Sequence, residues 1–175
     1  MMIRQASAEY RVIKITRGWV GVAYTGRGIR ALTLPVQGRK KALESLRSQF
    51  SARLVRGEGY QRLAHDLDRY FQGRAISFNY PLDLTAATPF QRRVWTALQE
   101  IPYGATRTYQ EVARAIRMPR ALRAVGQAVG GNPIPLLIPC HRVVASGGSL
   151  GGYAWGLMWK RRLLRVEGIG PRLSA

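Results

Sequence analysis

Hydrophobic and polar residues alternate in three short runs near the N-terminus and then recur at helical spacing. The three runs cover residues 10–15, 19–25 and 29–34, and turns that contain glycine separate them. Such runs predict a small antiparallel meander. Two stripes with a period of three to four residues follow, and each predicts a helix that covers the sheet. The stripes consist of Leu43, Leu46 and Phe50, and of Leu63, Leu67, Tyr70 and Phe71.

Signals for helix starts dominate the second half of the chain. Thr88-Pro89-Phe90-Gln91 combines an N-cap hydroxyl, a proline at the first helical position and a glutamine three residues after the cap. Thr108-Tyr109-Gln110-Glu111 is a second capping box, which predicts a short helix as far as Ile116. Pro119 breaks it before another helix over residues 120–129. Two short helices joined by a tight turn resemble a helix-turn-helix.

The second helix of this pair carries mostly small side chains around Arg123. Small side chains let a helix approach its neighbour closely. That neighbour is either another helix or a DNA groove too narrow for a bulky helix, and the basic character of the chain favours the groove.

The character of the sequence changes near residue 80, from strands with helices to helices alone. We therefore predict an α+β protein with two domains. Residues 1–80 form a sheet-based N-terminal domain, residues 81–88 a linker, and residues 89–175 a mostly helical C-terminal domain with the helix-turn-helix.

Charge narrows the choice of partners. Lys and Arg number 28 against 9 Asp and Glu, so the formal net charge is +19, and both halves are basic. An excess of this size predicts a polyanionic partner. A single cysteine excludes an internal disulfide, no apolar run approaches the length of a membrane span, and the N-terminus lacks the core of a secretory signal. We expect a cytoplasmic or nucleoid-associated protein with no membrane contact.

The only cysteine, Cys140, follows the apolar run 134–138 and precedes His141 and Arg142. We expect the run to be a buried, strand-like segment that delivers the thiol to the end of an element. A free cysteine is often just a small buried hydrophobe. Thiolate is the nucleophilic form, however, and an adjacent imidazole or cation lowers the pKa of a thiol, so this setting favours a reactive cysteine.

A histidine that takes the proton of the thiol needs an acceptor that orients its ring. The second half of the chain holds only Glu100, Glu111 and Glu167. Glu111 is expected in the capping box and Glu100 at a helix end, which leaves Glu167 after a helix over residues 157–166. A carboxylate there opposes the helix dipole, which hints at a partner, although an ordinary surface carboxylate stays an alternative.

The glycine-rich stretch 147–153 lacks the Lys-Ser/Thr ending of a phosphate loop. It fits a flexible pocket wall whose backbone N–H groups meet a ligand. His65 lies on a predicted helix without a second metal ligand nearby, and we interpret it as structural.

The segment 133–144, with Gly131-Asn132 and residues 123–126 before it, resembles the O6-alkylguanine-DNA alkyltransferases, also called methylated-DNA-protein-cysteine methyltransferases. The likeness runs from about Thr88 to Gly168. It implies a ribonuclease-H-like N-terminal domain and a helix-turn-helix that binds the minor groove of double-stranded DNA. The implied reaction moves an alkyl group, chiefly methyl, from a flipped-out O6-alkylguanine to Cys140 and inactivates the protein. The implied protein is a monomer without metal or cofactor, and O4-alkylthymine is a second candidate substrate.

The same resemblance implies roles for the site residues. His141 would act on Cys140 through a water, Glu167 would orient the imidazole, and Asn132 would hold the turn that places the thiolate. Tyr109 would rotate the nucleotide and Arg123 would fill the gap that it leaves in the duplex. The residues implied to contact DNA are Tyr109, Gln110, Arg123 and Ser146. Those implied to hold the base are Tyr109, the Val143 carbonyl, Tyr153, the Ala154 N–H and Trp155.

Two residues depart from other members of that family. Ala154 replaces a serine found in some relatives, and Trp155 stands where others have glycine. The bulk of Trp155 predicts a narrow pocket that disfavours large alkyl groups such as benzyl.

Two other classes of function remain open at this point. A helix-turn-helix regulator or architectural protein needs only the charge and the two helices, and its cysteine would be incidental. A cysteine hydrolase would use Cys140 and His141 for more than one turnover per chain.

Overall fold

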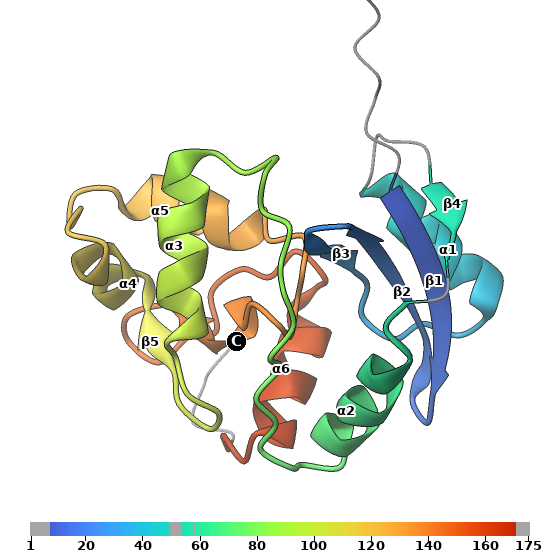
Figure 1. Ribbon diagram of the computed structural model, residues 1–175. Coiled ribbons are helices and arrows are strands. Elements are labelled where there is room, and N and C mark those ends of the chain that lie inside the picture. The colour runs from blue at the N-terminus through green and yellow to red at the C-terminus, as the bar shows by residue number, and fades with distance from the viewer. Residues whose placement is uncertain (1–7, 50–53, 58, 171–175) are drawn as a thin grey trace, which may run out of the picture. The chain divides into compact units, whose positions relative to one another are not determined.

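The computed structural model describes residues 8–49, 54–57 and 59–170 (Figure 1). These residues divide into two compact units. Unit 1 comprises the chain up to Gln72 together with Ile76–Thr85, and unit 2 comprises Gly73–Ala75 and the chain from Ala86 onward. No helix in the described ranges is long and apolar enough to cross a bilayer.

A four-stranded sheet in the order β3-β2-β1-β4 organises unit 1. The strands β1 (Ala8–Ile15), β2 (Gly18–Thr25) and β3 (Gly28–Leu32) pair antiparallel, so the predicted meander is confirmed. A fourth strand, β4 (Leu54–Arg56), pairs parallel to β1. The sequence pattern did not predict this short strand, because three residues carry too little periodicity.

Two helices, α1 (Arg39–Ser48) and α2 (Gln61–Phe71), accompany the sheet at the positions of the two apolar stripes. Leu46 of α1 packs on Ala23 and Ala31 of the sheet. Gly21 makes this close approach possible, since a Cβ atom there would lie 2.9 Å from the Ala42 carbonyl oxygen. Five consecutive residues of β2, positions 20–24, are buried, so this strand is covered on both faces.

The segment that follows α2 is bound to the edge of the sheet. The Ile29 N–H donates to the Pro81 carbonyl at 2.8 Å, and the Asp83 N–H donates to the Ile29 carbonyl at 2.8 Å. The Asp83 carboxylate also accepts from the Thr25 hydroxyl at 2.8 Å. Part of the predicted linker 81–88 thus lies along β3, and the domain boundaries themselves stay a prediction.

Unit 2 consists mainly of helices, named in chain order α3 (Pro89–Gln99), α4 (Tyr109–Ala115), α5 (Leu122–Gly130) and α6 (Leu157–Val166). Both predicted capping boxes are present, at Thr88 and at Thr108. A short parallel pair, β5 (Arg107–Thr108) with β6 (Val143–Val144), completes the unit. The mixed α and β architecture predicted from the pattern is confirmed.

The turn between α4 and α5 has an unusual residue. Arg117 adopts φ 58°, in the left-handed region where glycine usually ends a helix. A left-handed backbone costs an L-residue about 1–2 kcal/mol relative to the right-handed one. The guanidinium of Arg93, on α3, donates to the carbonyl of Ile116 at 2.7 Å and so satisfies the residue that caps the C-terminal end of α4.

The predicted strand over residues 134–138 is wrong. The segment is buried as expected, but it forms turns, with one bridge between Pro135 and Ile138 and a hydrogen bond of 3.0 Å from the Ile138 N–H to the Ile134 carbonyl. Pro133, Pro135 and Pro139 explain the difference, because each lacks the N–H group that a strand ladder needs.

Candidate active site

Cys140 is the first residue of a single 3₁₀ turn, Cys140–Arg142, and only 4% of it is exposed. Asn132 fixes the turn that precedes it. The Asn132 Nδ2 donates to the Ile138 carbonyl at 2.8 Å and to the Cys140 Sγ at 3.0 Å, while its Oδ1 accepts from the Ile134 N–H at 3.0 Å. One side chain thereby holds both the loop and the sulfur, which is the contact expected of a group that positions a nucleophile.

Opposing influences act on the Cys140 thiol. Burial raises its pKa, while hydrogen bonds from Asn132 and Tyr153 and the charge of Lys160 lower it. The balance leaves the pKa above its ordinary value. The resting group is therefore a thiol that is already surrounded by donors suited to a thiolate.

His141 and Glu167 form a fully buried pair, with 2.7 Å between Nε2 and Oε1 and neither side chain exposed. The carboxylate comes from the residue that caps the C-terminal end of α6. Burial lowers the pKa of His141, so the ring is neutral at pH 7. Burial raises the pKa of Glu167, but the hydrogen bonds from His141 and Arg142 and the charge of Arg142 outweigh it, and the pKa falls to about 2. A neutral imidazole bound to a carboxylate at Nε2 carries its proton there and keeps Nδ1 basic.

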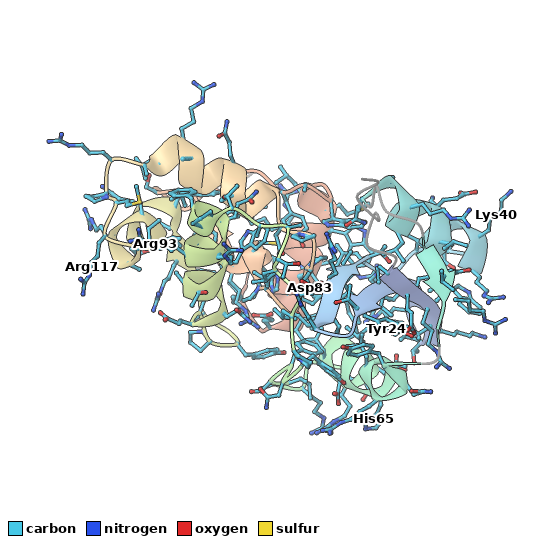
Figure 2. All side chains as sticks on the ribbon, turned by 45° about the horizontal axis from the view of Figure 1, so that its top comes forward. Tyr24, Lys40, His65, Asp83, Arg93 and Arg117 are labelled. Carbon is cyan, nitrogen blue, oxygen red and sulfur yellow. The ribbon has the colours of Figure 1, made fainter. Side chains whose placement is uncertain are left out.

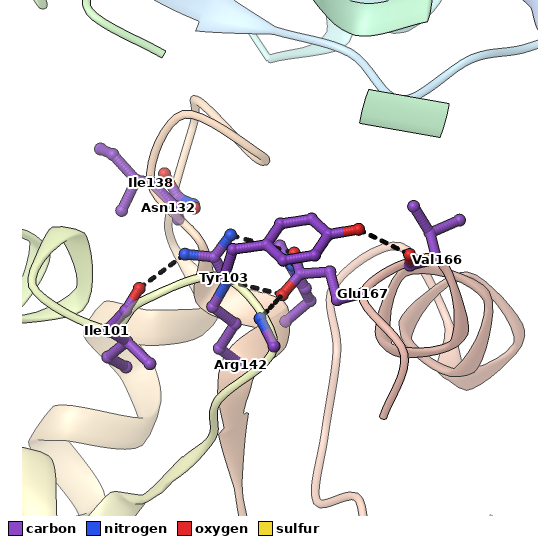
Figure 3. A network of polar contacts seen from close by, with 9 residues as sticks. Ile101, Tyr103, Asn132, Ile138, Arg142, Val166 and Glu167 are labelled. Atoms are coloured by element: carbon purple, nitrogen blue, oxygen red, sulfur yellow. Dashed lines mark hydrogen bonds and ion pairs between the residues drawn. The ribbon is translucent and has the colours of Figure 1, made fainter. Parts of the chain in front are cut away.

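Arg142 holds the other side of the same carboxylate (Figure 3). Its Nε donates to Glu167 Oε2 at 2.9 Å and an Nη to Oε1 at 3.0 Å, a bidentate pair, while the second Nη donates to the Ile101 carbonyl at 2.6 Å. The Gly104 N–H also donates to Oε2, at 3.2 Å. These contacts fix the carboxylate that holds His141.

The turn after α3 packs on this network. The Tyr103 hydroxyl donates to the Val166 carbonyl at 2.7 Å, and the Arg142 guanidinium lies 6.0 Å from the centre of the Tyr103 ring. The turn therefore contacts both the end of α6 and the arginine next to the histidine.

Lys160 of α6 is a second buried cation close to Cys140. Its Nζ donates to the carbonyls of Val143 at 2.6 Å, Leu150 at 2.5 Å and Gly152 at 3.1 Å. Burial lowers its pKa to about 8, although the charge of the Cys140 thiolate raises it. Lys160 thus joins β6 to the glycine-rich loop. Sequence reasoning missed it, yet Lys160 shares the buried stripe of α6 with Leu163 and Leu164, and a lysine in such a stripe is a signal.

Tyr109, at the start of α4, lies against the glycine-rich loop. Its hydroxyl is 3.4 Å from the Gly152 carbonyl, and a Cβ atom on Gly151 would come within 2.9 Å of its ring. Lys160 Nζ lies 6.0 Å from the centre of that ring, and the pKa of Tyr109 is raised by burial and by the charge of Cys140. Glycine at position 151 is what lets the tyrosine reach the neighbourhood of the sulfur.

The structure gathers some of the predicted site residues and leaves others at the surface. Asn132, Tyr153 and Tyr109 interact with Cys140, and His141 contacts Glu167. The Val143 carbonyl, implied to meet the base, already accepts from Lys160. The following site residues take no part in the hydrogen bonds described above, and all but the half-buried Trp155 are exposed: Gln110, Arg123, Ser146, Ala154 and Trp155.

No group of three or more His, Cys, Asp or Glu side chains that could hold a metal ion occurs within the described parts of the chain.

Comparisons with known proteins agree on one class, the DNA alkyltransferases. Residues 89–169 match the family model of the 6-O-methylguanine DNA methyltransferase DNA-binding domain. A methylated-DNA–protein-cysteine methyltransferase of Methanosarcina barkeri is 42% identical over 159 residues, which are 90% of this chain and 96% of that protein. That of Mycolicibacterium paratuberculosis is 52% identical over 101 residues, 58% of this chain and 61% of that protein.

Solved structures give the same result. The Mycobacterium tuberculosis OGT in complex with DNA matches with a TM-score of 0.76 and 38% identity, over 95% of this chain and 96% of that one. The O6-methylguanine-DNA methyltransferase of Pyrococcus kodakaraensis matches with a TM-score of 0.71 and 26% identity, over 92% and 99%. The chain belongs to the family of methylated-DNA–protein-cysteine methyltransferases.

Proposed function

We propose that this protein repairs DNA by moving the methyl group of O6-methylguanine in duplex DNA onto the Sγ atom of Cys140, once per molecule. The observation that carries the proposal is a buried thiol beside a His141–Glu167 pair, in a member of this family. O4-alkylthymine is a further candidate substrate.

His141 is the base in this reaction. Its neutral ring takes the thiol proton at Nδ1 through a water molecule, and Asn132, Tyr153 and Lys160 favour the resulting thiolate. Glu167, ionised at pH 7, stabilises the imidazolium that forms and fixes the ring orientation.

The thiolate then attacks the methyl carbon. An Sγ–C bond forms and the C–O6 bond breaks, and the electron pair of the broken bond stays on the guanine. The proton that His141 took from the thiol ends on the departing guanine, so atoms and charges balance and the step needs no oxidant or reductant. The Ala154 N–H at O6 and a proton at ring N3 stabilise the departing guanine. The thioether is stable, and therefore each molecule acts once.

The methylated base has to leave the duplex before Sγ can reach it. In our proposal α4 and α5 form a helix-turn-helix, and the small side chains of α5 enter the minor groove. Tyr109 turns the nucleotide out, Arg123 fills the gap, and Gln110 and Ser146 contact the backbone. The exposure of the last three side chains supports these roles.

The flipped base is held by the Val143 carbonyl, Tyr153, Ala154 and Trp155. The protein acts as a monomer, and the ribonuclease-H-like topology of unit 1 belongs to the same proposal.

A stoichiometric assay tests the function. The protein is mixed with an excess of duplex DNA that carries O6-methylguanine with a labelled methyl group, and the peptides of the protein are then separated. We expect one label per protein on the peptide that contains Cys140. Cys140→Ala binds the same duplex and takes no label. Label on another peptide, or more than one demethylation per chain, contradicts the proposal.

A further inference from the structure

A groove of about 470 Å³ lies in unit 2 between α3 and the end of α4, and none of its residues belongs to the site around Cys140. Its volume falls within the range of about 300–1,000 Å³ that ligand pockets occupy. Figure 2 labels two of the lining residues, Arg93 and Arg117, which lie near each other in unit 2. The lining residues are Arg92, Arg93, Thr96, Ala97, Glu100, Ala115, Ile116 and Arg117.

The charges of the groove are unbalanced. Three arginines line it, and the only carboxylate among the lining residues is that of Glu100. All three arginines are exposed at the surface, and Arg93 also donates to the Ile116 carbonyl. A guanidinium presents a planar fork of N–H donors that matches phosphate oxygens. The chemistry of the groove therefore favours an anion with several oxygens.

The backbone of Arg117 is a second and independent sign of function. This residue keeps a left-handed conformation that a glycine would adopt without strain. A cation near the end of a helix is favoured by the helix dipole, but Arg114 in the last turn of α4 already provides one. The dipole alone does not explain an arginine here, because strained residues persist mainly where the side chain is needed.

We infer that this groove is a second phosphate-binding surface, which contacts the backbone of duplex DNA beyond the nucleotide taken up at Cys140. Arg117 and Arg92 are the contacting groups. The inference rests on the proposed binding of DNA by α4 and α5, because Arg117 lies in the turn that joins these two helices. Phosphodiester groups are the anions that this partner supplies at regular spacing along its surface.

The test measures the affinity for a duplex that carries O6-methylguanine, by fluorescence anisotropy between 50 and 200 mM salt. The variants are Arg117→Gly, Arg92→Gln and, for the opposite sign, Glu100→Gln. Each arginine variant should lower the slope of log K against log salt by about one and weaken binding about threefold at the low-salt end. Glu100→Gln should strengthen binding.

The matched control is Lys40→Gln, which removes one exposed positive charge from unit 1. It should leave the slope unchanged. An equal loss in this control would show an effect of net charge alone and overturn the inference, as would unchanged binding by both arginine variants. Arg117→Gly also relieves the backbone strain, so its melting temperature should stay equal or rise. Weak binding by this variant therefore does not reflect misfolding.

Two further measurements separate this inference from the proposed function. Methyl transfer from a short single-stranded oligonucleotide, too short to reach the groove, should proceed in Arg117→Gly at the wild-type rate. If the wild-type protein itself transfers no methyl group, the proposed function fails. The salt dependence of DNA binding by the arginine variants then still tests whether the groove binds phosphate groups. A loss of binding to polyglutamate without a loss for duplex DNA would assign the groove to an acidic protein and overturn the inference.

Discussion

Two buried cations flank Cys140, and they are held in different ways. Arg142 pairs with the carboxylate of Glu167 through two parallel hydrogen bonds. Lys160 has three neutral carbonyls as partners and no carboxylate among its hydrogen bonds. A carboxylate offsets the cost of burying a cation more fully than neutral carbonyl dipoles do, and burial accordingly lowers the pKa of Lys160.

This difference divides the site into a fixed side and an adjustable side. The arginine network joins the turn after α3, the 3₁₀ turn and the end of α6, and it sets the orientation of His141. Lys160 joins β6 to the glycine-rich loop, which is one wall of the proposed pocket. In the proposed reaction, the fixed side would govern the proton transfer and the adjustable side would govern which alkyl groups the pocket admits.

The largest effect is expected from Glu167→Ala, which breaks the fixed side. Arg142 is left buried without its carboxylate, and loss of one partner of a buried ion pair costs about 3–5 kcal/mol. Urea denaturation measures the change in the free energy of unfolding. Glu44→Ala is the control, because Glu44 makes only an exposed ion pair with Lys40. If Glu167→Ala lowers the free energy of unfolding no more than the control does, the arginine network does not fix this side of the site.

A smaller loss is expected from Lys160→Met, which breaks the adjustable side. Three carbonyls lose their donor, and each buried polar group left without one costs about 1–3 kcal/mol, offset by the charge that no longer has to be buried. Methyl transfer should slow as well, by more than the loss of folded protein explains, because Lys160 no longer holds the glycine-rich loop or stabilises the thiolate. The neighbouring Arg161→Met controls for charge, as Arg161 is exposed. Equal transfer rates in the two variants would remove Lys160 from the site.

Trp155→Gly sharpens the comparison by widening the adjustable side alone. The rate of benzyl transfer should rise relative to methyl transfer by about tenfold or more, the scale on which pocket volume discriminates small groups. The two rates are measured on oligonucleotides that carry O6-benzylguanine or O6-methylguanine. Comparable benzyl and methyl rates in the wild-type protein already contradict a narrowing role for Trp155.

The effect of pH on the stability of the folded protein should be smallest near neutral pH, and it should differ between the two sides of the site. The pKa of Glu167 is lowered to about 2 from 4.5, so its contribution to stability is complete above pH 4.5 and is lost as the pH falls toward 2. The pKa of Lys160 is lowered to about 8 from 10.5, so the folded protein releases that proton first, and the cost of burying the charge disappears as the pH rises through this interval.

Transfer should respond to the same titration. Its rate should rise with pH as thiolate forms and then level off above pH 8, where Lys160 no longer favours the thiolate. The break should be absent in Lys160→Met. A rate that keeps rising through pH 10 in the wild-type protein would contradict this assignment.

Local signals in the sequence predicted most of the elements and part of the site. The capping boxes at Thr88 and Thr108 depend only on residues three apart, and they marked their helices correctly. The choice of Glu167 by elimination led to the residue that contacts His141, because few carboxylates were available. The prediction of a strand-like segment over residues 134–138 was wrong. The segment is buried like a core strand, but its prolines lack the N–H groups that strand pairing needs.

Long-range contacts explain what the sequence could not predict. The three carbonyls that bind Lys160 are backbone groups, which have no sequence signature. Arg142 was visible only as a neighbour of the thiol, and its role beside Glu167 depends on a separation of 25 residues. The short strand β4 depends on pairing with β1, more than 40 residues earlier in the chain.

The burial of Cys140 matters also before any lesion is met. A reagent that works once has to survive storage in the cell, and oxidants attack exposed thiolates faster than buried thiols. Cys140 is 4% exposed and its pKa lies above the ordinary value, so its sulfur is held as a buried thiol, the form that oxidants attack more slowly. The chain has no other cysteine that could protect this sulfur in a reversible disulfide. How long the protein stays active before it meets a lesion therefore depends on the burial of Cys140.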